Sequence, residues 1–179
     1  RKYKLNLIVA NEFVAQIEIK EGFKIADFGC GSGYFAIKLA KAASTGGKVF
    51  AIDIQETLLE SVRSRAKADH LYNIETVKAD LEKPDGSGLS AQSIDLVFMA
   101  NILHQSQNQA AILKEAGRVL KKDGMLAALE WHKNTPLSPK EGWLIEKEDL
   151  EKLANEAGFQ KEKDLETDNF HYGIVFKKL

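Results

Sequence analysis

A short apolar run that ends in alternating glycines constrains this fold more than any other feature. Residues 25–35 read IADFGCGSGYF, so a segment typical of a buried strand passes directly into Gly29, Gly31 and Gly33. Because glycine has no Cβ, ligand atoms can approach the main chain closely at such a turn, and nucleotide-like ligands often bind there. The same turn can also serve only to pack a helix against its strand. The motif taken alone leaves both interpretations open.

Strand-like and helix-like patterns alternate along the chain. Apolar residues at helical spacing over 4–19 predict an N-terminal helix within residues 1–20. Helices are further expected at 34–43, 55–70, 107–124 and 145–159, and strands at 24–29, 48–54, 74–80, 94–100, 125–132 and, as a pair joined near Asp168-Asn169, in 159–179. This alternation predicts an α/β fold, a doubly wound and mainly parallel sheet with helices on both faces.

Length and charge narrow the function classes. The 179 residues suit a single domain over 1–179, and 25 Lys and Arg against 26 Asp and Glu give no field that attracts nucleic acid or an anionic membrane. No apolar run approaches the roughly 20 residues of a membrane span. The one cysteine, Cys30, fits a reducing cytoplasm, where we expect the protein. The chain starts at Arg1 instead of Met, so native residues upstream are expected; the sequence leaves the oligomeric state open.

The glycine spacing argues against a nicotinamide dinucleotide. The dinucleotide fingerprint has glycine at the first, third and sixth positions, and counting from Gly29 the sixth position is Tyr34. An acidic residue, Asp27, stands two positions before the first glycine instead. A nicotinamide-dependent oxidoreductase therefore stays only as an alternative.

Polar residues end the next three predicted strands. Asp53 ends AIDI about 20 residues past the loop, where a carboxylate can accept hydrogen bonds from ribose hydroxyls. Asp80 ends VKAD and could accept a hydrogen bond from a purine amino group, and Asn101 follows IDLVFMA. Since the carboxyl ends of parallel strands meet at one edge of a sheet, these residues should line one crevice with the loop.

The stretches IADFGCGSGYFAIKLA, VFAIDI, VKAD and IDLVFMANILHQ, in this order, resemble the cofactor motifs of class I S-adenosylmethionine-dependent methyltransferases. NILH and the later EKEDLEKLANEAGF resemble most the small-molecule branch that includes the ubiquinone and menaquinone biosynthesis methyltransferases. The resemblance implies a Rossmann-like, seven-stranded sheet of order 3-2-1-4-5-7-6 whose last strand is antiparallel, which the tail 159–179 would complete.

The resemblance also implies which residues bind S-adenosylmethionine and its product S-adenosylhomocysteine. Asp27 and the glycine loop would hold the methionine moiety, Asp53 the ribose and Asp80 the adenine, while Asn101 and Ile102 would border the reacting methyl group. The implied cofactor site consists of Asp27, Gly29, Cys30, Gly31, Gly33, Asp53, Ile54, Asp80, Leu81, Asn101 and Ile102.

Catalysis and the acceptor are less constrained. If the acceptor must lose a proton, a nearby base would assist, and His104 is the first candidate and His132 the second. Residues 132–146 form a possible substrate-covering loop. We predict methyl transfer to a small molecule, with no metal; a protein that binds the cofactor or its product without catalysis is the alternative. The sequence has no basic stripe interleaved with aromatic residues, which argues against a nucleic-acid substrate.

Overall fold

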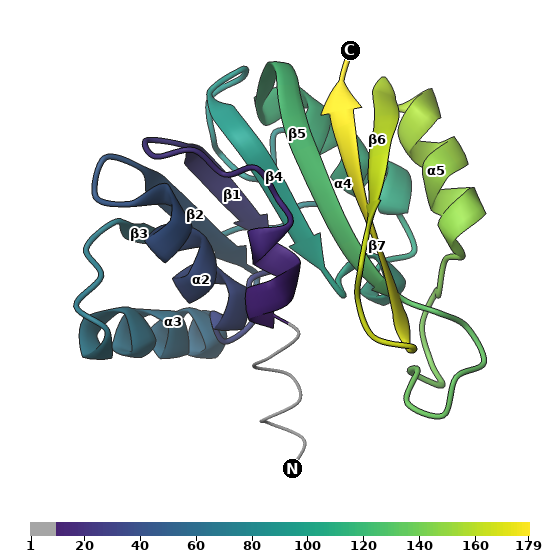
Figure 1. The fold of residues 1–179 in the computed structure, drawn as a ribbon, viewed down its shortest axis with the longest axis horizontal. Coiled ribbons are helices and arrows are strands. Elements are labelled where there is room, and N and C mark those ends of the chain that lie inside the picture. The colour runs from purple at the N-terminus through teal and green to yellow at the C-terminus, as the bar shows by residue number, and fades with distance from the viewer. Residues whose placement is uncertain (1–9) are drawn as a thin grey trace.

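A computed structural model describes residues 10–179 and places them around one seven-stranded sheet of order β3-β2-β1-β4-β5-β7-β6 (Figure 1). This is the predicted strand order. Of the predicted N-terminal helix, residues 10–15 are helical, and residues 1–9 lie outside the described part of the chain. Within residues 10–179, no helix combines the length and the apolar character that crossing a membrane requires.

Strands and helices alternate up to the C-terminal hairpin. The strands are β1 (Lys24–Phe28), β2 (Lys48–Asp53), β3 (Ile74–Lys78), β4 (Ile94–Ala100), β5 (Leu120–Trp131), β6 (Phe159–Leu165) and β7 (His171–Lys178). The helices are α2 (Tyr34–Ala43), α3 (Glu56–Ala68), α4 (Gln109–Val119) and α5 (Lys147–Glu156), with a 3-10 turn η1 at Leu103–Gln105.

The sheet is parallel from β3 to β5 and antiparallel where β7 joins it. Strand β1 pairs in parallel with both β2 and β4, so it lies inside the sheet, and β4 pairs in parallel with β5. Strand β7 runs antiparallel to both β5 and β6. Because β1, β2 and β4 point the same way, their carboxyl ends and the loops after them share one edge of the sheet.

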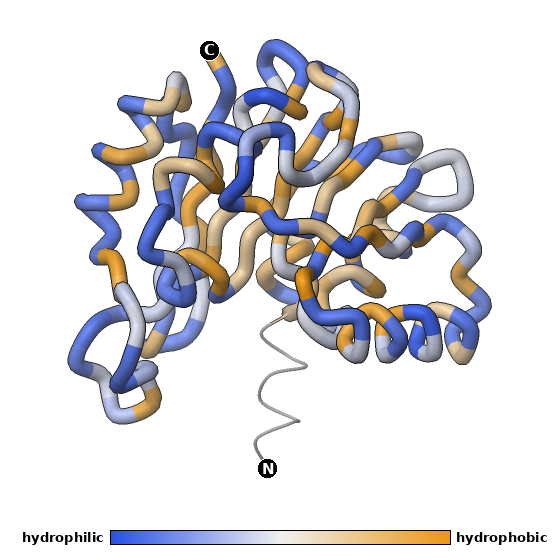
Figure 2. Tube along the Cα trace, turned by 180° about the vertical axis from the view of Figure 1, so that it is seen from behind, coloured by the Kyte–Doolittle hydropathy of each residue, from blue (hydrophilic) through white to orange (hydrophobic). Residues whose placement is uncertain are grey.

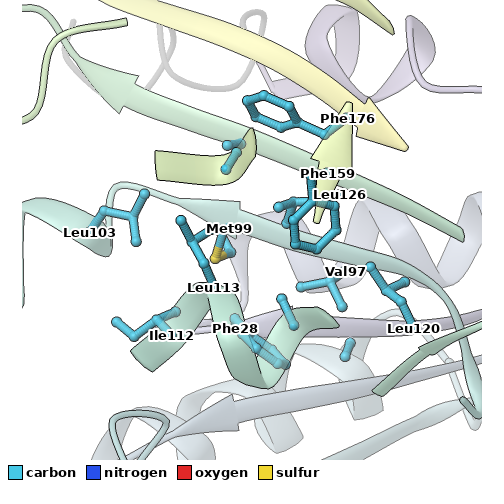
Figure 3. Close-up of a cluster of buried hydrophobic side chains, with 14 of the residues drawn as sticks. Phe28, Val97, Met99, Leu103, Ile112, Leu113, Leu120, Leu126, Phe159 and Phe176 are labelled. Atoms are coloured by element: carbon cyan, nitrogen blue, oxygen red, sulfur yellow. The ribbon is translucent and has the colours of Figure 1, made fainter. Parts of the chain in front are cut away.

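Alternate residues of the central strands face two separate cores. Ile25 and Leu96 face the core under residues 13–17, α2 and α3, whereas the next residues, Ala26 and Val97, face the core under α4 and α5. Figure 3 shows the second core, where Met99 of β4 lies close to Leu113 of α4. Orange and tan prevail along the central strands in Figure 2, and most of the blue lies on outer helices and loops. Burial on both faces is what the apolar strand sequences require.

The predicted boundary between α4 and β5 is wrong. Residues 107–124 were expected to form one helix ending at Gly124, but α4 ends at Val119 and β5 begins at Leu120. Leu120 is fully buried and pairs with Ile94, and the pairing of β4 and β5 then shifts register before Met125. Asp123 adopts a left-handed φ of 65°, which a continuing helix would not allow. Burial of Leu120 in the sheet thus overrides the helical spacing.

Candidate functional site

The loops after β1, β2, β3 and β4 enclose a cavity of about 520 Å³, called the cofactor cavity below. Ten of the residues predicted from the sequence line it: Asp27, Gly29, Cys30, Gly31, Asp53, Ile54, Asp80, Leu81, Asn101 and Ile102. Gly33 and His104 are not among its lining residues. The parallel strands therefore bring together side chains that are up to 75 positions apart in the sequence.

Two glycines of the loop are required for different reasons. Gly29 has a φ of 72°, and a Cβ built on it would lie 2.2 Å from Cγ2 of Ile102 in the loop after β4. Gly33 has a φ of 90°, and its Cβ would lie 2.9 Å from Cγ2 of Val62 in α3. The missing Cβ of Gly29 thus lets Ile102 pack directly against the glycine loop, whereas that of Gly33 lets the start of α2 pack on α3. For Gly33, the helix-packing interpretation of the motif holds.

Asp53 connects the glycine loop to the end of β2. Its Oδ2 accepts a hydrogen bond from the Gly31 N–H at 3.0 Å, and its Oδ1 accepts one from the Gln55 N–H at 3.0 Å. Cys30 adds a further tie, since its N–H donates to the Ile52 carbonyl at 2.8 Å. A carboxylate has about four acceptor positions, so both Asp53 oxygens keep capacity for a ligand.

Asp27 is the most perturbed carboxyl group at the site. The residue is 2% exposed, and its Oδ2 has no hydrogen-bond partner among the described residues. Burial, and then the charge of Asp53, raises the pKa of Asp27 to about 8. Burial, followed by the charges of Asp27 and Asp53, also raises the pKa of the Cys30 thiol, which keeps it protonated. An unpaired buried carboxyl group is costly unless a ligand pairs with it.

The other strand ends carry Asp80 and Asn101. Oδ1 of Asp80 accepts a hydrogen bond from the Glu82 N–H at 3.0 Å, and Leu81 beside it is buried. Asn101 has a left-handed φ of 58°, and its N–H donates to the Leu129 carbonyl at 2.8 Å. Its Oδ1 is buried without a partner among the described residues. Each of these residues therefore retains hydrogen-bonding capacity toward the cavity.

A second cavity of about 620 Å³ adjoins the first and shares Ser32, Tyr34, Phe35 and Asn101 with it. We call it the β7 cavity, because His171 of β7 lines it and does not line the cofactor cavity. The rest of its wall consists of Ile37, Lys38, Arg65, Ala68, Asp69, Leu129, Trp131, Asp168 and His171. Of these, sequence reasoning placed Asp168 only in a turn and missed His171 and Trp131. The sequence offered one signal for them, which is that both belong to predicted strands. In the structure these strands pair, and Trp131 lies opposite His171.

The two predicted histidine bases lie outside both cavities. His104 in η1 is buried, and its Nδ1 lies 2.8 Å from Oε1 of Glu130, whose Oε2 accepts the Leu103 N–H at 2.9 Å. His132 is partly exposed, with Nδ1 4.0 Å from Oε2 of Glu146. Neither lines the cofactor cavity or the β7 cavity. Their roles as bases stay predictions.

Residues 132–146 connect β5 to α5 and line neither cavity. The Trp143 N–H donates to the His104 carbonyl at 2.8 Å, and Nε2 of Gln109 donates to the Trp143 carbonyl at 2.7 Å. The Trp143 side chain remains half exposed. The segment is therefore tied to η1 and α4, and its covering role stays a prediction. Within residues 10–179 there is no cluster of three metal-ligating side chains.

Comparison with known proteins adds an independent finding. A family model described as a methyltransferase domain matches residues 19–172. The demethylmenaquinone methyltransferase of Staphylococcus aureus is 34% identical over 113 residues, which cover 63% of this chain and 44% of that protein. That of Lactobacillus johnsonii is 29% identical over 134 residues, 74% of this chain and 53% of that protein. The chain thus spans about half the length of the curated relatives it matches.

The same fold occurs in solved structures. A SAM-dependent methyltransferase from Aquifex aeolicus superimposes with a TM-score of 0.88 at 24% identity, covering 100% of this chain and 94% of that one. This likeness concerns the fold. Because the family model covers most of the chain, including every strand end that lines the cofactor cavity, the protein belongs to the methyltransferase-domain family.

Proposed function

We propose that the protein binds S-adenosylmethionine in the cofactor cavity and transfers its methyl group to a small-molecule acceptor. The observation that carries the proposal is the convergence of Asp27, Asp53, Asp80 and Asn101 from four strand ends on one cavity. Family membership supports it. A relative is named demethylmenaquinone methyltransferase, and we extend the methyl transfer that this name states for that protein to the present chain.

The lining residues fit the three parts of this cofactor. Asp27 has an unpaired, buried Oδ2, which suits a positively charged ammonium group such as that of the methionine moiety. Asp53 has acceptor capacity left on both oxygens, which suits the two ribose hydroxyls. Asp80 suits an exocyclic amino group, with Leu81 and the exposed Ile54 as apolar contacts for a flat base.

When bound, S-adenosylmethionine supplies an electrophilic methyl group, so the protein needs no covalent nucleophile. The chain's contribution is to orient the acceptor and to exclude water. Because binding already fixes the positions of both reactants, the entropic part of the activation barrier is much smaller than in solution. The wall that the two cavities share consists of Ser32, Tyr34, Phe35 and Asn101. The acceptor would meet the cofactor at that wall.

Calorimetric titration with S-adenosylmethionine, S-adenosylhomocysteine and NADH tests the proposal. We expect micromolar binding of the first two and none of NADH, because Tyr34 replaces the third glycine of the dinucleotide fingerprint. Binding of NADH alone would overturn the proposal. Binding of both sulfur compounds without turnover of any acceptor would favour a non-catalytic binding protein.

A further inference from the structure

The β7 cavity contains a histidine and carboxylate pair that neither the motifs nor the family comparison assigns. We propose, building on the proposed function, that the β7 cavity binds the methyl acceptor, and that His171 accepts a hydrogen bond from a hydroxyl group on a flat, apolar acceptor. Asp168 would act as its positioning residue.

The location of the β7 cavity supports an acceptor site. It shares Ser32, Tyr34, Phe35 and Asn101 with the cofactor cavity, so a molecule in one cavity lies directly beside a molecule in the other. Asn101 belongs to the wall where the methyl group would emerge. A volume of about 620 Å³ is within the range of small-molecule sites, which spans roughly 300–1,000 Å³.

His171 is held in one orientation by its neighbours. Its Nδ1 lies 2.9 Å from Oδ1 and 3.0 Å from Oδ2 of Asp168, and its ring lies against Trp131 with a centroid distance of 3.9 Å. Oδ1 of Asp168 also accepts the N–H groups of Phe170 and His171, which fixes the carboxylate itself. A carboxylate beside Nδ1 favours the tautomer with hydrogen on Nδ1, and this leaves the lone pair on Nε2.

Unpaired polar atoms gather around the two cavities. Among the described residues, the buried side-chain atoms without a hydrogen-bond partner are Asp27 Oδ2, Tyr34 OH, Asn101 Oδ1, Thr167 Oγ1 and His171 Nε2. All of these residues except Thr167 line one cavity or both. Buried polar groups in proteins are nearly always paired, so this concentration indicates hydrogen bonds that are completed by ligands.

The chemistry of the wall defines the acceptor class. With hydrogen on Nδ1, Nε2 of His171 accepts a hydrogen bond, as does Oδ1 of Asn101, so a molecule that pairs with these two atoms offers donors to them. Phe35, Leu129 and Trp131 add apolar and aromatic surface to the same cavity. A hydroxylated aromatic ring satisfies both conditions. When its oxygen forms a bond to the methyl carbon, the methyl–sulfur bond of S-adenosylmethionine would break and S-adenosylhomocysteine would leave. The hydroxyl proton would pass to Nε2, and the Asp168 carboxylate would balance the charge of the imidazolium.

The test compares 2-naphthol with naphthalene, which has the same rings without the hydroxyl group. Their affinities are measured by calorimetry with and without S-adenosylhomocysteine, on the wild type and on His171→Phe, which keeps a ring against Trp131. The control variant is His70→Asn, because His70 is exposed, lines neither cavity, and has a φ of 53° that Asn tolerates. We expect wild type and control to prefer 2-naphthol about tenfold, and His171→Phe to lose this preference.

A second readout does not depend on that variant's folding. In wild-type protein, ¹⁵N shifts of the His171 ring should report hydrogen on Nδ1, and Asp168→Asn should mix the tautomers and reduce the 2-naphthol preference. Hydrogen on Nε2 in the wild type, equal affinity for both probes, or a preference that survives in His171→Phe would each overturn the inference. Failure of S-adenosylhomocysteine to bind would instead overturn the proposed function, and the ligand-free titrations would still decide whether His171 recognises a hydroxyl group.

Discussion

Replacing Asp27 with Asn should stabilise the ligand-free protein and weaken cofactor binding at the same time. The Asp27 carboxyl group is buried, its Oδ2 is unpaired among the described residues, and burial and then the nearby charge of Asp53 raise its pKa to about 8 from 3.8. Between these two values the folded chain holds a proton that the unfolded chain has released. The free energy of unfolding must therefore fall as the pH rises through that window.

The size of the effect follows from the width of the window. Each pH unit is worth about 1.4 kcal/mol, so the roughly three units between the ordinary Asp pKa and pH 7 amount to about 4 kcal/mol for a dry site. Water that reaches Oδ2 would reduce this to about 2 kcal/mol. Asn keeps the shape without the charge, so Asp27→Asn should exceed the wild type in stability by about 2 to 4 kcal/mol at pH 7 and by little at pH 4.

Urea denaturation at several pH values and calorimetry with S-adenosylhomocysteine measure the two effects. Loss of a charge-assisted hydrogen bond should weaken S-adenosylhomocysteine binding by about 10-fold to 100-fold. Asp123→Asn is the matched control, because the Asp123 side chain is largely exposed and lines neither cavity. An Asp27→Asn variant that is less stable than wild type by the same amount at every pH would contradict a raised pKa of Asp27. Unchanged affinity for S-adenosylhomocysteine would contradict its role in binding the ammonium group.

Substitutions at Asp53, Gly29 and His104 give three further predictions. Asp53→Ala removes the acceptor of the Gly31 and Gln55 N–H groups, so calorimetry should show cofactor affinity reduced about 10-fold to 100-fold; unchanged affinity would reject Asp53 as the ribose ligand. Gly29→Ala should lower the free energy of unfolding, measured by urea denaturation, by about 1 to 3 kcal/mol, because Gly29 has a φ of 72° and a Cβ there would clash with Ile102. Adding Ile102→Ala should restore only the part of this loss that the clash causes. Full restoration would show that the left-handed φ has no cost for Ala. His104→Ala should lower the free energy of unfolding by about 2 kcal/mol, since it leaves Glu130 buried without one partner, and should lower turnover only if His104 is the base.

Much of the fold could be predicted from the sequence because local patterns and long-range burial agree there. The run KIADF is apolar, β-forming and followed by glycine, and it forms an interior strand of a sheet buried on both faces. The patterns disagree at residues 120–124. The apolar spacing of these residues continues the helical spacing of α4, yet Leu120 belongs to the sheet. Strand instead of helix forms there because Leu120 pairs with Ile94, a contact between residues distant in the sequence.

The candidate site divides in the same way. Asp27, Asp53 and Asp80 could be placed because each lies within two residues of the carboxyl end of a parallel strand, and such ends share one edge of the sheet. His171 could not be placed, because its position depends on how the C-terminal hairpin joins β5 in antiparallel register. His104 stood close to the right strand end, but a sequence does not reveal that Glu130 holds its ring away from the cavities. Side-chain partners of this kind are decided by packing.

The most direct measurement is a crystal structure of the protein with S-adenosylhomocysteine. We expect the ligand in the cofactor cavity, with its ribose hydroxyls on Asp53, its ammonium group at Asp27 and its sulfur facing the wall at Asn101. A ligand bound in this cavity in the reverse orientation, or bound elsewhere on the protein, would contradict these assignments.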